Sequence, residues 1–381
     1  MIDRGTGAAF TPAVPPAYYV YLFSAFAFVL GASIGSFLNV CIYRMPRDLS
    51  VNEPRRSFCP GCKYQIPWWN NLPLISWLAL RGKCANCGAR ISFRYFGVEL
   101  LTGLLFLGVW WKVGPQAWVL AFPYWILVSL LVIATFIDFE FFIIPDEITW
   151  GGVAAGVLLS LAIPTMMGTE SNLAAAGWSI AGAAAGYFLL WGVVEAGKKL
   201  FGKKRVVLEK AEAFTWTRDG DDAELCVGEE KDKWSEFFAR DSDRLLMECT
   251  AAEISGEKFE KTTLDFHFDR VKVGEKTWEL TKLDTITGSV KEITIPREAM
   301  GFGDVKFIAG IGAFFGWQAV LFTVMAGSTF GAVIGVGTIA LGKREWSAKI
   351  PFGPYLALGA LVWLFSGREI VDWYLSLSRP N

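Results

Sequence analysis

The sequence predicts an all-α polytopic membrane protein with about eight transmembrane helices and two segments outside the bilayer. Hydrophobic residues make up 53% of the 381 residues and charged residues only 19%, a balance unlike that of an ordinary soluble domain. Two regions depart from it, a cysteine-containing segment in the first quarter of the chain and a charged block in the second half.

Apolar runs close to the ~20 residues of a membrane helix define the predicted helices. They lie at 18–41, 96–113, 117–137, 148–164, 173–197, 303–316, 317–341 and 352–375. The fourth and sixth runs are short. No cleavable signal peptide is expected, because the residues before the first run are polar and Pro-rich and the run itself is too long for one.

Lysine and arginine predict the orientation of these helices. Nine of them lie between Arg44 and Arg94, and others follow the fifth run and separate the seventh from the eighth. Because cytoplasmic loops are enriched in basic residues, these three connections are expected inside the cell and both termini outside.

Four cysteines in the first of these loops indicate a zinc site. Cys59 and Cys62 form "CPGC", and Cys84 and Cys87 form "CANC". Two such C-x-x-C pairs supply four thiolates for one closed, structural tetrahedral site. Two disulfides are the alternative, but a reducing cytoplasm disfavours them. Cys41, Cys226 and Cys249 lack metal spacing and are expected to be packing residues.

The charged block at 203–297 is predicted to be a soluble insertion. It contains 22 of the 37 acidic residues and no run that could cross a membrane. Its second half alternates β-branched or aromatic residues with polar ones, which predicts several antiparallel strands. The single histidine, His267, lies in this alternation and is interpreted as a strand-face residue rather than a ligand or a base.

Two acids, Asp138 and Asp304, adjoin predicted membrane helices at the cytoplasmic side. Asp304 lies in "GFGDVKF", where it could simply cap a helix, since Asp is a good N-cap residue. Asp138 ends the third run, so both acids are expected at one depth. Two close carboxyls share a proton and can serve as base and acid in peptide hydrolysis. Asp146 is interpreted as the cap of the fourth helix rather than a third catalytic acid.

Several motifs together resemble the bacterial prepilin peptidases, membrane aspartyl proteases of the GxGD type. The similar stretches are "GASIGSFLNVCIYRMPR" at 31–47, the cysteine segment at 59–103, "IDFEFFIIPD" at 137–146, "REAMGFGDVKFIAGIGAFFGW" at 297–317 and "IPFGPYLALGA" at 350–360. This resemblance implies that Asp138 and Asp304 are the catalytic pair. Gly301 and Gly303 would let an extended peptide lie beside Asp304.

The resemblance also implies a substrate and a second activity. Family members cleave the leader of type IV prepilins and type II secretion pseudopilins at the cytoplasmic face of the bacterial inner membrane. Members with the cysteine segment usually then methylate the new N-terminal amine with S-adenosylmethionine. The residues alone do not indicate a methyl-donor site, because no glycine-rich nucleotide motif follows a predicted strand.

Two features depart from the family. The aromatic "FEFFII" follows Asp138 where polar residues are common, which leaves the substrate preference open. The charged insertion interrupts a connection that is usually short; it could dock pilus or secretion assembly proteins, select substrates or only decorate the loop.

The rival hypotheses are an ion- or proton-coupled transporter and a non-catalytic zinc-bearing assembly scaffold. Acids among membrane helices favour a transporter in general terms, but two acids at one face do not form a path across a bilayer. The predicted divisions of the chain are an N-terminal tail (1–17), a first helix (18–43), a zinc segment (44–94), helices two to five (95–202), the insertion (203–298) and helices six to eight (299–381).

Overall fold

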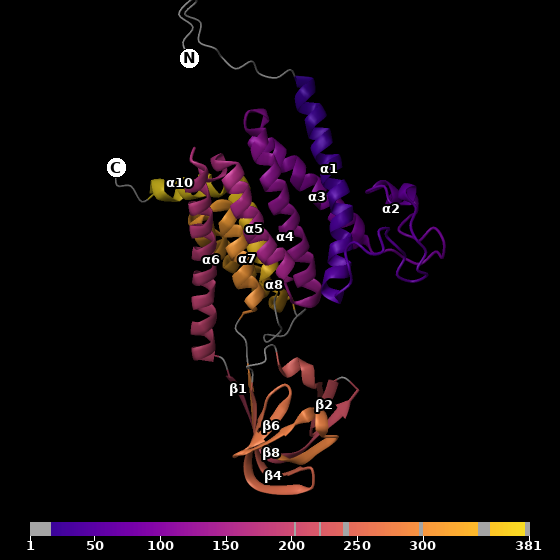
Figure 1. The fold of residues 1–381 in the computed structure, drawn as a ribbon, viewed down its shortest axis with the longest axis vertical. Coiled ribbons are helices and arrows are strands. Elements are labelled where there is room, and N and C mark those ends of the chain that lie inside the picture. The colour runs from indigo at the N-terminus through magenta and orange to yellow at the C-terminus, as the bar shows by residue number, and fades with distance from the viewer. Residues whose placement is uncertain are drawn as a thin grey trace, which may run out of the picture. The chain divides into compact units, whose positions relative to one another are not determined.

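The computed structural model describes residues 17–201, 203–220, 222–238, 244–296, 300–341 and 351–377, and it divides into a helical unit and a sheet unit (Figure 1). The helical unit comprises the chain up to Leu190 and from Phe302 onward, and the sheet unit comprises Trp191–Gly301. The predicted N-terminal tail, apart from Ala17, and the basic loop at 342–350 lie outside the described residues.

The described part of the chain contains helices α1 to α10. They are α1 (Ala17–Arg44), α2 (Ile75–Ala79), α3 (Phe93–Val113), α4 (Ala121–Phe141), α5 (Asp146–Ala162), α6 (Asn172–Phe201), α7 (Phe302–Phe315), α8 (Trp317–Ala340), α9 (Gly353–Val362) and α10 (Arg368–Leu377), with a π-helical turn at Trp363–Gly367 between the last two.

Five segments among the described residues are long and apolar enough to cross a membrane. They are Tyr18–Arg47, Phe93–Val113, Pro115–Phe141, Asn172–Lys199 and Trp317–Ala340. Five of the eight predicted spans are therefore supported, and the count of eight is not confirmed. The other three predicted spans correspond to α5 with 17 residues, α7 with 14 residues, and α9 joined to α10 through the π-helical turn.

Helix α7 lies among other helices, which bury it from Asp304 almost to its end. It contacts α4, α5, α8 and α9. Helix α6 also approaches it closely, because a Cβ built on Gly182 would collide with the carbonyl oxygen of Gly312. The Ser179 hydroxyl of α6 donates a hydrogen bond to the Ala313 carbonyl at 2.6 Å. Small residues four apart, Gly182 and Gly186, thus bring two backbones together as in membrane helix pairs.

The sheet unit is one antiparallel sheet of eight strands in the order β3-β2-β1-β8-β4-β5-β6-β7. The strands are β1 (Lys203–Asp219), β2 (Asp222–Val227), β3 (Glu230–Lys233), β4 (Leu245–Ile254), β5 (Glu257–Phe266), β6 (Arg270–Val273), β7 (Lys276–Glu279) and β8 (Thr285–Pro296). The antiparallel strands expected in the second half of the insertion are confirmed, and strands of the first half, β1 to β3, complete the sheet.

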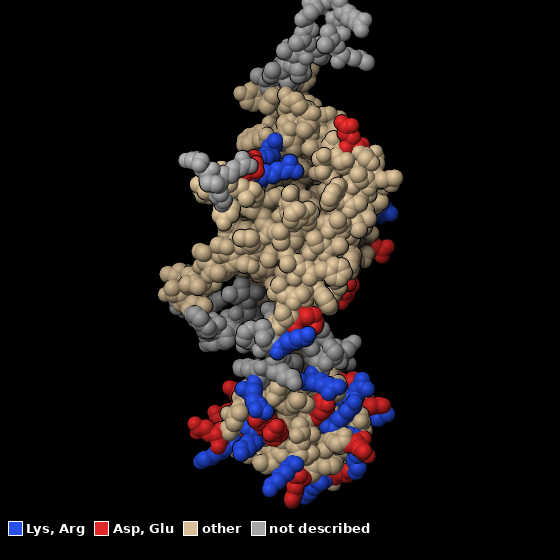
Figure 2. Space-filling model, turned by 90° about the vertical axis from the view of Figure 1, so that its left-hand side faces the viewer, with Lys and Arg blue, Asp and Glu red and all other residues tan. Residues whose placement is uncertain are grey.

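Alternation along the strands gives this unit its own core. Trp216, Phe214, Met247 and Phe266 are among the fully buried side chains, and Cys249 packs with them. Figure 2 shows acidic and basic side chains over the surface of this unit, whereas the face of the helical unit in view is mostly uncharged, with a few scattered charged side chains. His267 was predicted to be a strand-face residue, but β5 ends at Phe266 and β6 begins at Arg270, so it lies in the connection between them. It is buried there, with 9% of its surface exposed.

Candidate active site and metal centre

Asp138 lies one turn before the end of α4. The helix ends because Phe142 adopts a left-handed conformation, with φ of 56°, and its N–H donates to the Asp138 carbonyl at 3.0 Å. The Asp138 side chain is only 5% exposed. A carboxyl group is thus held inside the helical unit at the point where the chain turns from α4 toward α5.

Asp304 is the third residue of α7, so it lies in the first turn of the helix rather than before it. It is 7% exposed, and among the described residues its Oδ1 has no hydrogen-bond partner. An orphaned buried carboxylate oxygen is costly, which is unusual for a group whose only role is to cap a helix.

The structure brings the two acids together from distant parts of the chain. Helix α4 contacts α7, and the carboxylates of Asp138 and Asp304 are close enough for their charges to repel each other. Two buried carboxyls in such a position do not both ionise readily, because neither has water to stabilise its charge. Two neighbouring carboxyls of which only one ionises are a combination that acid–base hydrolysis can use.

A third helix fixes the orientation of Asp138. The Gly353 N–H, at the start of α9, donates to Asp138 Oδ2 at 2.9 Å. A Cβ on Gly353 would lie 2.7 Å from that oxygen, so only glycine allows this contact without displacement. Gly353 was not predicted to be a site residue, although "FGP" before an apolar run was a visible signal of a specialised helix start.

The two glycines of the GxGD sequence differ in their surroundings. Gly303 lies in the first turn of α7, and a Cβ there would lie 3.3 Å from Cβ of Ile144, in the link between α4 and α5. Its small size therefore allows close packing of α7 against that link. Gly301 precedes α7 and is exposed. The peptide-binding role predicted for both glycines stays a prediction.

The interpretation of Asp146 as a helix cap was wrong. The N-cap position of α5 is occupied by Pro145, and Asp146 is the first helical residue without a side-chain capping bond. Its Oδ1 instead accepts a hydrogen bond from Lys306 Nζ at 2.6 Å. This ion pair joins the start of α5 to the second turn of α7, two residues after Asp304.

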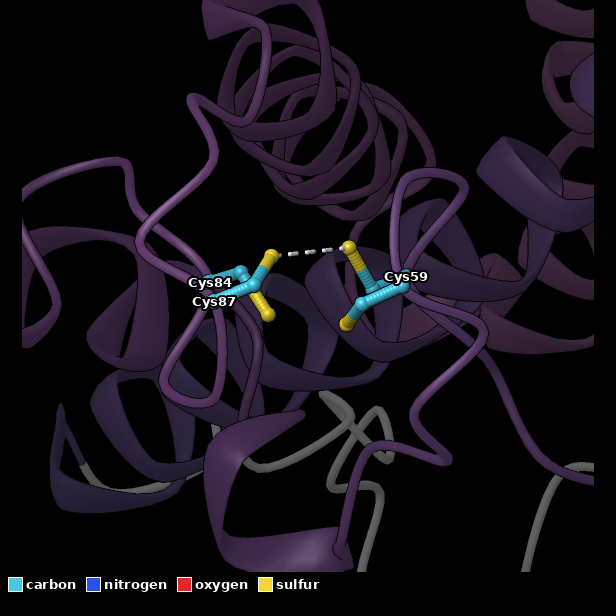
Figure 3. Close-up of side chains that lie close together, drawn as sticks. Cys59, Cys84 and Cys87 are labelled. Carbon is cyan, nitrogen blue, oxygen red and sulfur yellow. Dashed lines mark hydrogen bonds between the residues drawn. The ribbon is translucent and has the colours of Figure 1, made fainter.

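The four cysteines of the two C-x-x-C pairs form one cluster. Their sulfur atoms all lie within 4.8 Å of one another, and Figure 3 shows thiols from two separate turns of the chain directed toward each other. The Sγ atoms of Cys59 and Cys87 are 3.9 Å apart. Tetrahedral Zn–S bonds of about 2.3 Å would separate sulfurs by about 3.8 Å, whereas a disulfide needs about 2.0 Å. The geometry fits a single four-thiolate metal ion, and all four thiols are free.

Both pairs are built on the same local turn. Cys59 N–H donates to the Tyr64 carbonyl at 3.0 Å, and Cys84 N–H donates to the Ala89 carbonyl at 2.8 Å. The turns open on short antiparallel bridges, Phe58 with Gln65 and Lys83 with Arg90. Because the same hairpin occurs twice, each copy directs its two thiols toward a common point.

Hydrogen bonds to sulfur favour a thiolate at Cys62. The Tyr64 backbone N–H and then the Asn86 side chain lower the pKa of Cys62 to about 6. Since the thiolate is the form that binds metal, this residue is prepared for ligation at neutral pH. The cluster could therefore hold a metal ion, as its spacing predicts.

Comparison with known families decides which group of proteins has this architecture. Residues 29–113 match the bacterial peptidase A24 N-terminal domain, and residues 125–207 and 285–336 match the type IV leader peptidase family. A relative from Stutzerimonas stutzeri, a prepilin leader peptidase/N-methyltransferase, is 30% identical over 377 residues that cover 93% of this chain and 94% of the relative. The chain belongs to the type IV leader peptidase family.

Other members of the type IV leader peptidase family support the assignment. A prepilin leader peptidase/N-methyltransferase from Aeromonas hydrophila is 29% identical over 93% of this chain and 95% of its own length. One of the same name from Myxococcus xanthus is 41% identical over 53% of this chain and 59% of its own length. No solved structure matches the chain. These findings do not favour a transporter or an assembly scaffold.

The family matches also bear on the insertion and the site. Residues 208–284, which form most of the sheet unit, lie between the two matched parts of the type IV leader peptidase family. Asp138 lies in the first matched part and Asp304 in the second. The sheet therefore interrupts the family's shared region between the two acids.

Proposed function

We propose that this protein is a membrane-embedded aspartyl endopeptidase that removes the leader of type IV prepilins or type II secretion pseudopilins, and that it methylates the amine so exposed. The observation that carries the peptidase half is the convergence of Asp138 and Asp304, two buried carboxyls on α4 and α7. The names of the relatives support both halves.

The proposed peptidase step uses only carboxyls and water. One carboxylate of the pair takes a proton from water, which attacks the carbonyl carbon of the scissile bond. The other, protonated, carboxyl donates its proton to the carbonyl oxygen, and the tetrahedral intermediate then expels the amine. The Gly353 N–H holds Asp138 Oδ2 in place throughout, so that the other oxygen of this carboxyl is free to face the substrate.

The proposed membrane arrangement extends the five candidate spans to eight. Helices α5 and α7 and the continuous α9–α10 segment complete the set, and α7 can be short because neighbouring helices rather than lipid surround it. The basic residues of 44–94 support a cytoplasmic position for that segment and an active site at the cytoplasmic face of the bacterial inner membrane.

The division of the chain predicted from the sequence also belongs to this proposal, with a zinc segment at 44–94 and a cytoplasmic insertion at 203–298. Zinc is the metal we propose for the four-cysteine cluster, since a closed shell of four thiolates suits a structural zinc ion. Its role would be to fold a segment that has little apolar core. Prepilin or pseudopilin chains are the proposed substrates, and pilus or secretion assembly proteins are further candidates for partners.

Methyl transfer requires a donor that the fold itself does not supply. S-adenosylmethionine would supply an electrophilic methyl group on a sulfonium sulfur. This chain would have to hold the new N-terminal amine, in its neutral form, beside that methyl group. The relatives' N-methyltransferase names support this second activity.

The decisive experiment is leader cleavage by the purified, detergent-solubilised protein acting on a prepilin peptide. The wild type should cleave it, and Asp138→Asn and Asp304→Asn should each lower the rate at least ~100-fold, because acid–base catalysis by a positioned group contributes that much. Asp146→Asn is the matched control, an acid near the site that is exposed and paired with Lys306. It should cleave within a few-fold of wild type.

The outcomes separate the competing functions. A folded wild type that does not cleave any prepilin peptide would contradict the peptidase proposal. Ion uptake into vesicles that depends on either acid, without cleavage, would instead support the transporter hypothesis.

A further inference from the structure

The cysteine segment carries an exposed apolar surface at and before the short helix α2. Four large side chains form it, and each is 58–70% exposed: Trp68, Trp69, Ile75 and Leu78, here called the α2 patch. Ile75 and Leu78 lie three residues apart and so share one face of α2. The rings of Trp68 and Trp69 meet edge to face, with centroids 5.8 Å apart. Large apolar side chains exposed together mark a site of contact with a partner or a membrane.

Hydrogen bonds and ring packing hold the α2 patch in one place. Ser76 is buried, and its hydroxyl donates to the Trp69 carbonyl at 3.1 Å and accepts from the Leu72 N–H at 2.9 Å. Trp77 packs its ring against that of Phe93, the first residue of α3, with centroids 5.6 Å apart. The tryptophan part of the patch is thus joined to α2, and α2 is joined to α3.

The position of α2 along α3 indicates what surrounds the patch. Helix α3 has 21 residues, about 30 Å of helix, so it is just long enough to cross the hydrocarbon and its ends must lie near the two boundaries. Leu74, which precedes α2, donates its N–H to Glu99 Oε2 at 2.7 Å. Glu99 lies about 9 Å along the helix from Phe93, where α3 begins. The start of α2 therefore lies beside the span of α3 and not beyond its end.

Helix α1 gives an independent measure of this depth. A Cβ on Gly35 would lie 2.8 Å from the Glu99 Cα, so the backbones of α1 and α3 meet at that level. Gly35 lies more than two turns before Arg44, the last residue of α1. Figure 1 agrees, because the loop that carries α2 extends sideways from the C-terminal part of α1 instead of continuing past its end. An apolar patch at this level faces the cytoplasmic half of a bilayer.

Two basic residues lie next to the patch. Arg81 and Lys83 follow α2 closely, and both are exposed. Gly82 between them packs on α2, because a Cβ there would lie 2.8 Å from the Trp77 indole. None of the ion pairs between described residues involves Arg81 or Lys83. Free cations beside an apolar surface favour a bilayer with anionic headgroups.

We propose that the α2 patch inserts into the cytoplasmic leaflet of a bilayer that contains anionic lipid, with Arg81 and Lys83 at the headgroups. Tryptophan suits this boundary because its ring is apolar and its N–H is polar. The inference rests on the proposed membrane arrangement, in which α3 spans the bilayer and 44–94 lies on the cytoplasmic side. It adds that the cysteine segment is bound to lipid by its own side chains, so the cluster of thiols is held at the membrane surface.

Photocrosslinking of the full-length protein in lipid nanodiscs tests this contact. p-Benzoylphenylalanine replaces Trp68 in one variant and Ile75 in another, so that the test survives if one variant fails to fold. The same group at Leu104, 51% exposed on α3, is the lipid-facing reference, and at Phe268, 50% exposed in the sheet unit, it is the control. Lipid adducts at both patch positions should be at least ~10-fold more abundant than at Phe268 and within about threefold of those at Leu104.

The composition of the adducts tests the role of charge. In nanodiscs with equal amounts of phosphatidylglycerol and phosphatidylcholine, the adducts at Trp68 should contain the anionic lipid at least ~3-fold more often, because two cations adjoin the patch. Arg81→Gln together with Lys83→Gln should bring this ratio close to one. Lys258→Gln together with Lys261→Gln, at two exposed lysines of β5, is the matched control and should leave the ratio unchanged.

The remaining outcomes separate this inference from the arrangement on which it rests. Lipid adducts at Leu104 but at neither Trp68 nor Ile75 would overturn the inference and leave the proposed arrangement standing. Crosslinks from the patch to a second copy of the chain in place of lipid, or a lipid ratio near one in the wild type, would overturn it as well. Absence of lipid adducts at Leu104 would refute α3 as a span, and the inference would fall with the arrangement.

Discussion

The acid pair and the four-cysteine cluster are both compact groups of a few side chains, but they are assembled by different means. The cysteines come from two local hairpins, each closed by its own backbone hydrogen bonds. The acids come from α4 and α7, and only helix packing brings them together. We therefore expect the first site to depend on the metal proposed for it and the second to depend on the whole helical unit, so that the two should fail independently.

The largest expected effect is on leader cleavage when one acid is lost. In Asp138→Asn and Asp304→Asn the rate of cleavage should fall at least ~100-fold, while methylation of a peptide supplied without its leader should stay within about twofold. Mass spectrometry of both products measures this in one preparation.

Equal loss of both activities in these acid variants would contradict the independence of the two sites. The control is the circular dichroism spectrum and elution volume of each variant, which should match wild type because Asn has nearly the shape of Asp.

The next effect concerns the cysteine cluster. Cys59→Ser together with Cys62→Ser should reduce bound zinc from about one per chain to none, since two thiolates cannot hold the ion that four hold. Residues 50–90 should then become more accessible to protease, and methylation should fall more than leader cleavage.

Mild chelation of the wild type offers a matched comparison, because it removes metal without changing a side chain. Cleavage should continue at close to its normal rate. Elemental analysis without zinc, or rapid loss of cleavage on chelation in a protein that stays folded, would show that this division of roles is wrong.

A smaller effect is expected at Gly353. Gly353→Ala adds a Cβ that would meet Asp138 Oδ2 at 2.7 Å, so the carboxyl must move and the hydrogen bond must lengthen. Cleavage should slow about 10-fold without a change in zinc content, since small displacements of a catalytic group are costly. Gly337→Ala, at a helical glycine with open space around its Cβ, is the control and should leave the rate unchanged.

The smallest effect is expected for the ion pair between Lys306 and Asp146. Because the Asp146 side chain is 64% exposed, the pair should contribute less than ~1 kcal/mol to stability. Lys306→Met should lower the thermal unfolding midpoint by at most a few degrees. A large loss of cleavage instead would mean that Lys306 acts on Asp304, two residues away, rather than only joining α7 to α5.

The contrast between the two sites also explains what the sequence could predict. The cysteine cluster was predictable because its spacing is local and its chemistry specific. Asp138 and Asp304 were predicted as the catalytic pair from their motifs, and their role stays a prediction. The contact of Gly353 with Asp138 was not predicted, because it depends on how α9 packs and no periodicity reveals that. The role of Asp146 was mistaken because its partner, Lys306, lies far away in the sequence.

Helix number was the least predictable feature of the fold. A span is recognised by about 20 apolar residues facing lipid, and five segments meet that standard. Helix α7 does not meet that standard, because it has only 14 residues and is surrounded by protein rather than by lipid. The sheet unit was easier to predict from the sequence, since its charge and its two-residue alternation both differ from those of the rest of the chain.

The pairing of β1 with β8 has an evolutionary consequence. Lys203 at the start of the sheet is the partner of Pro296 at its end, so the chain enters and leaves through neighbouring strands. Adjacent strands lie about 5 Å apart. A domain whose two ends lie close together can be inserted, lost or exchanged in one recombination event without changing the fold of the helical unit. The same property makes this position a suitable insertion site for a fluorescent reporter domain.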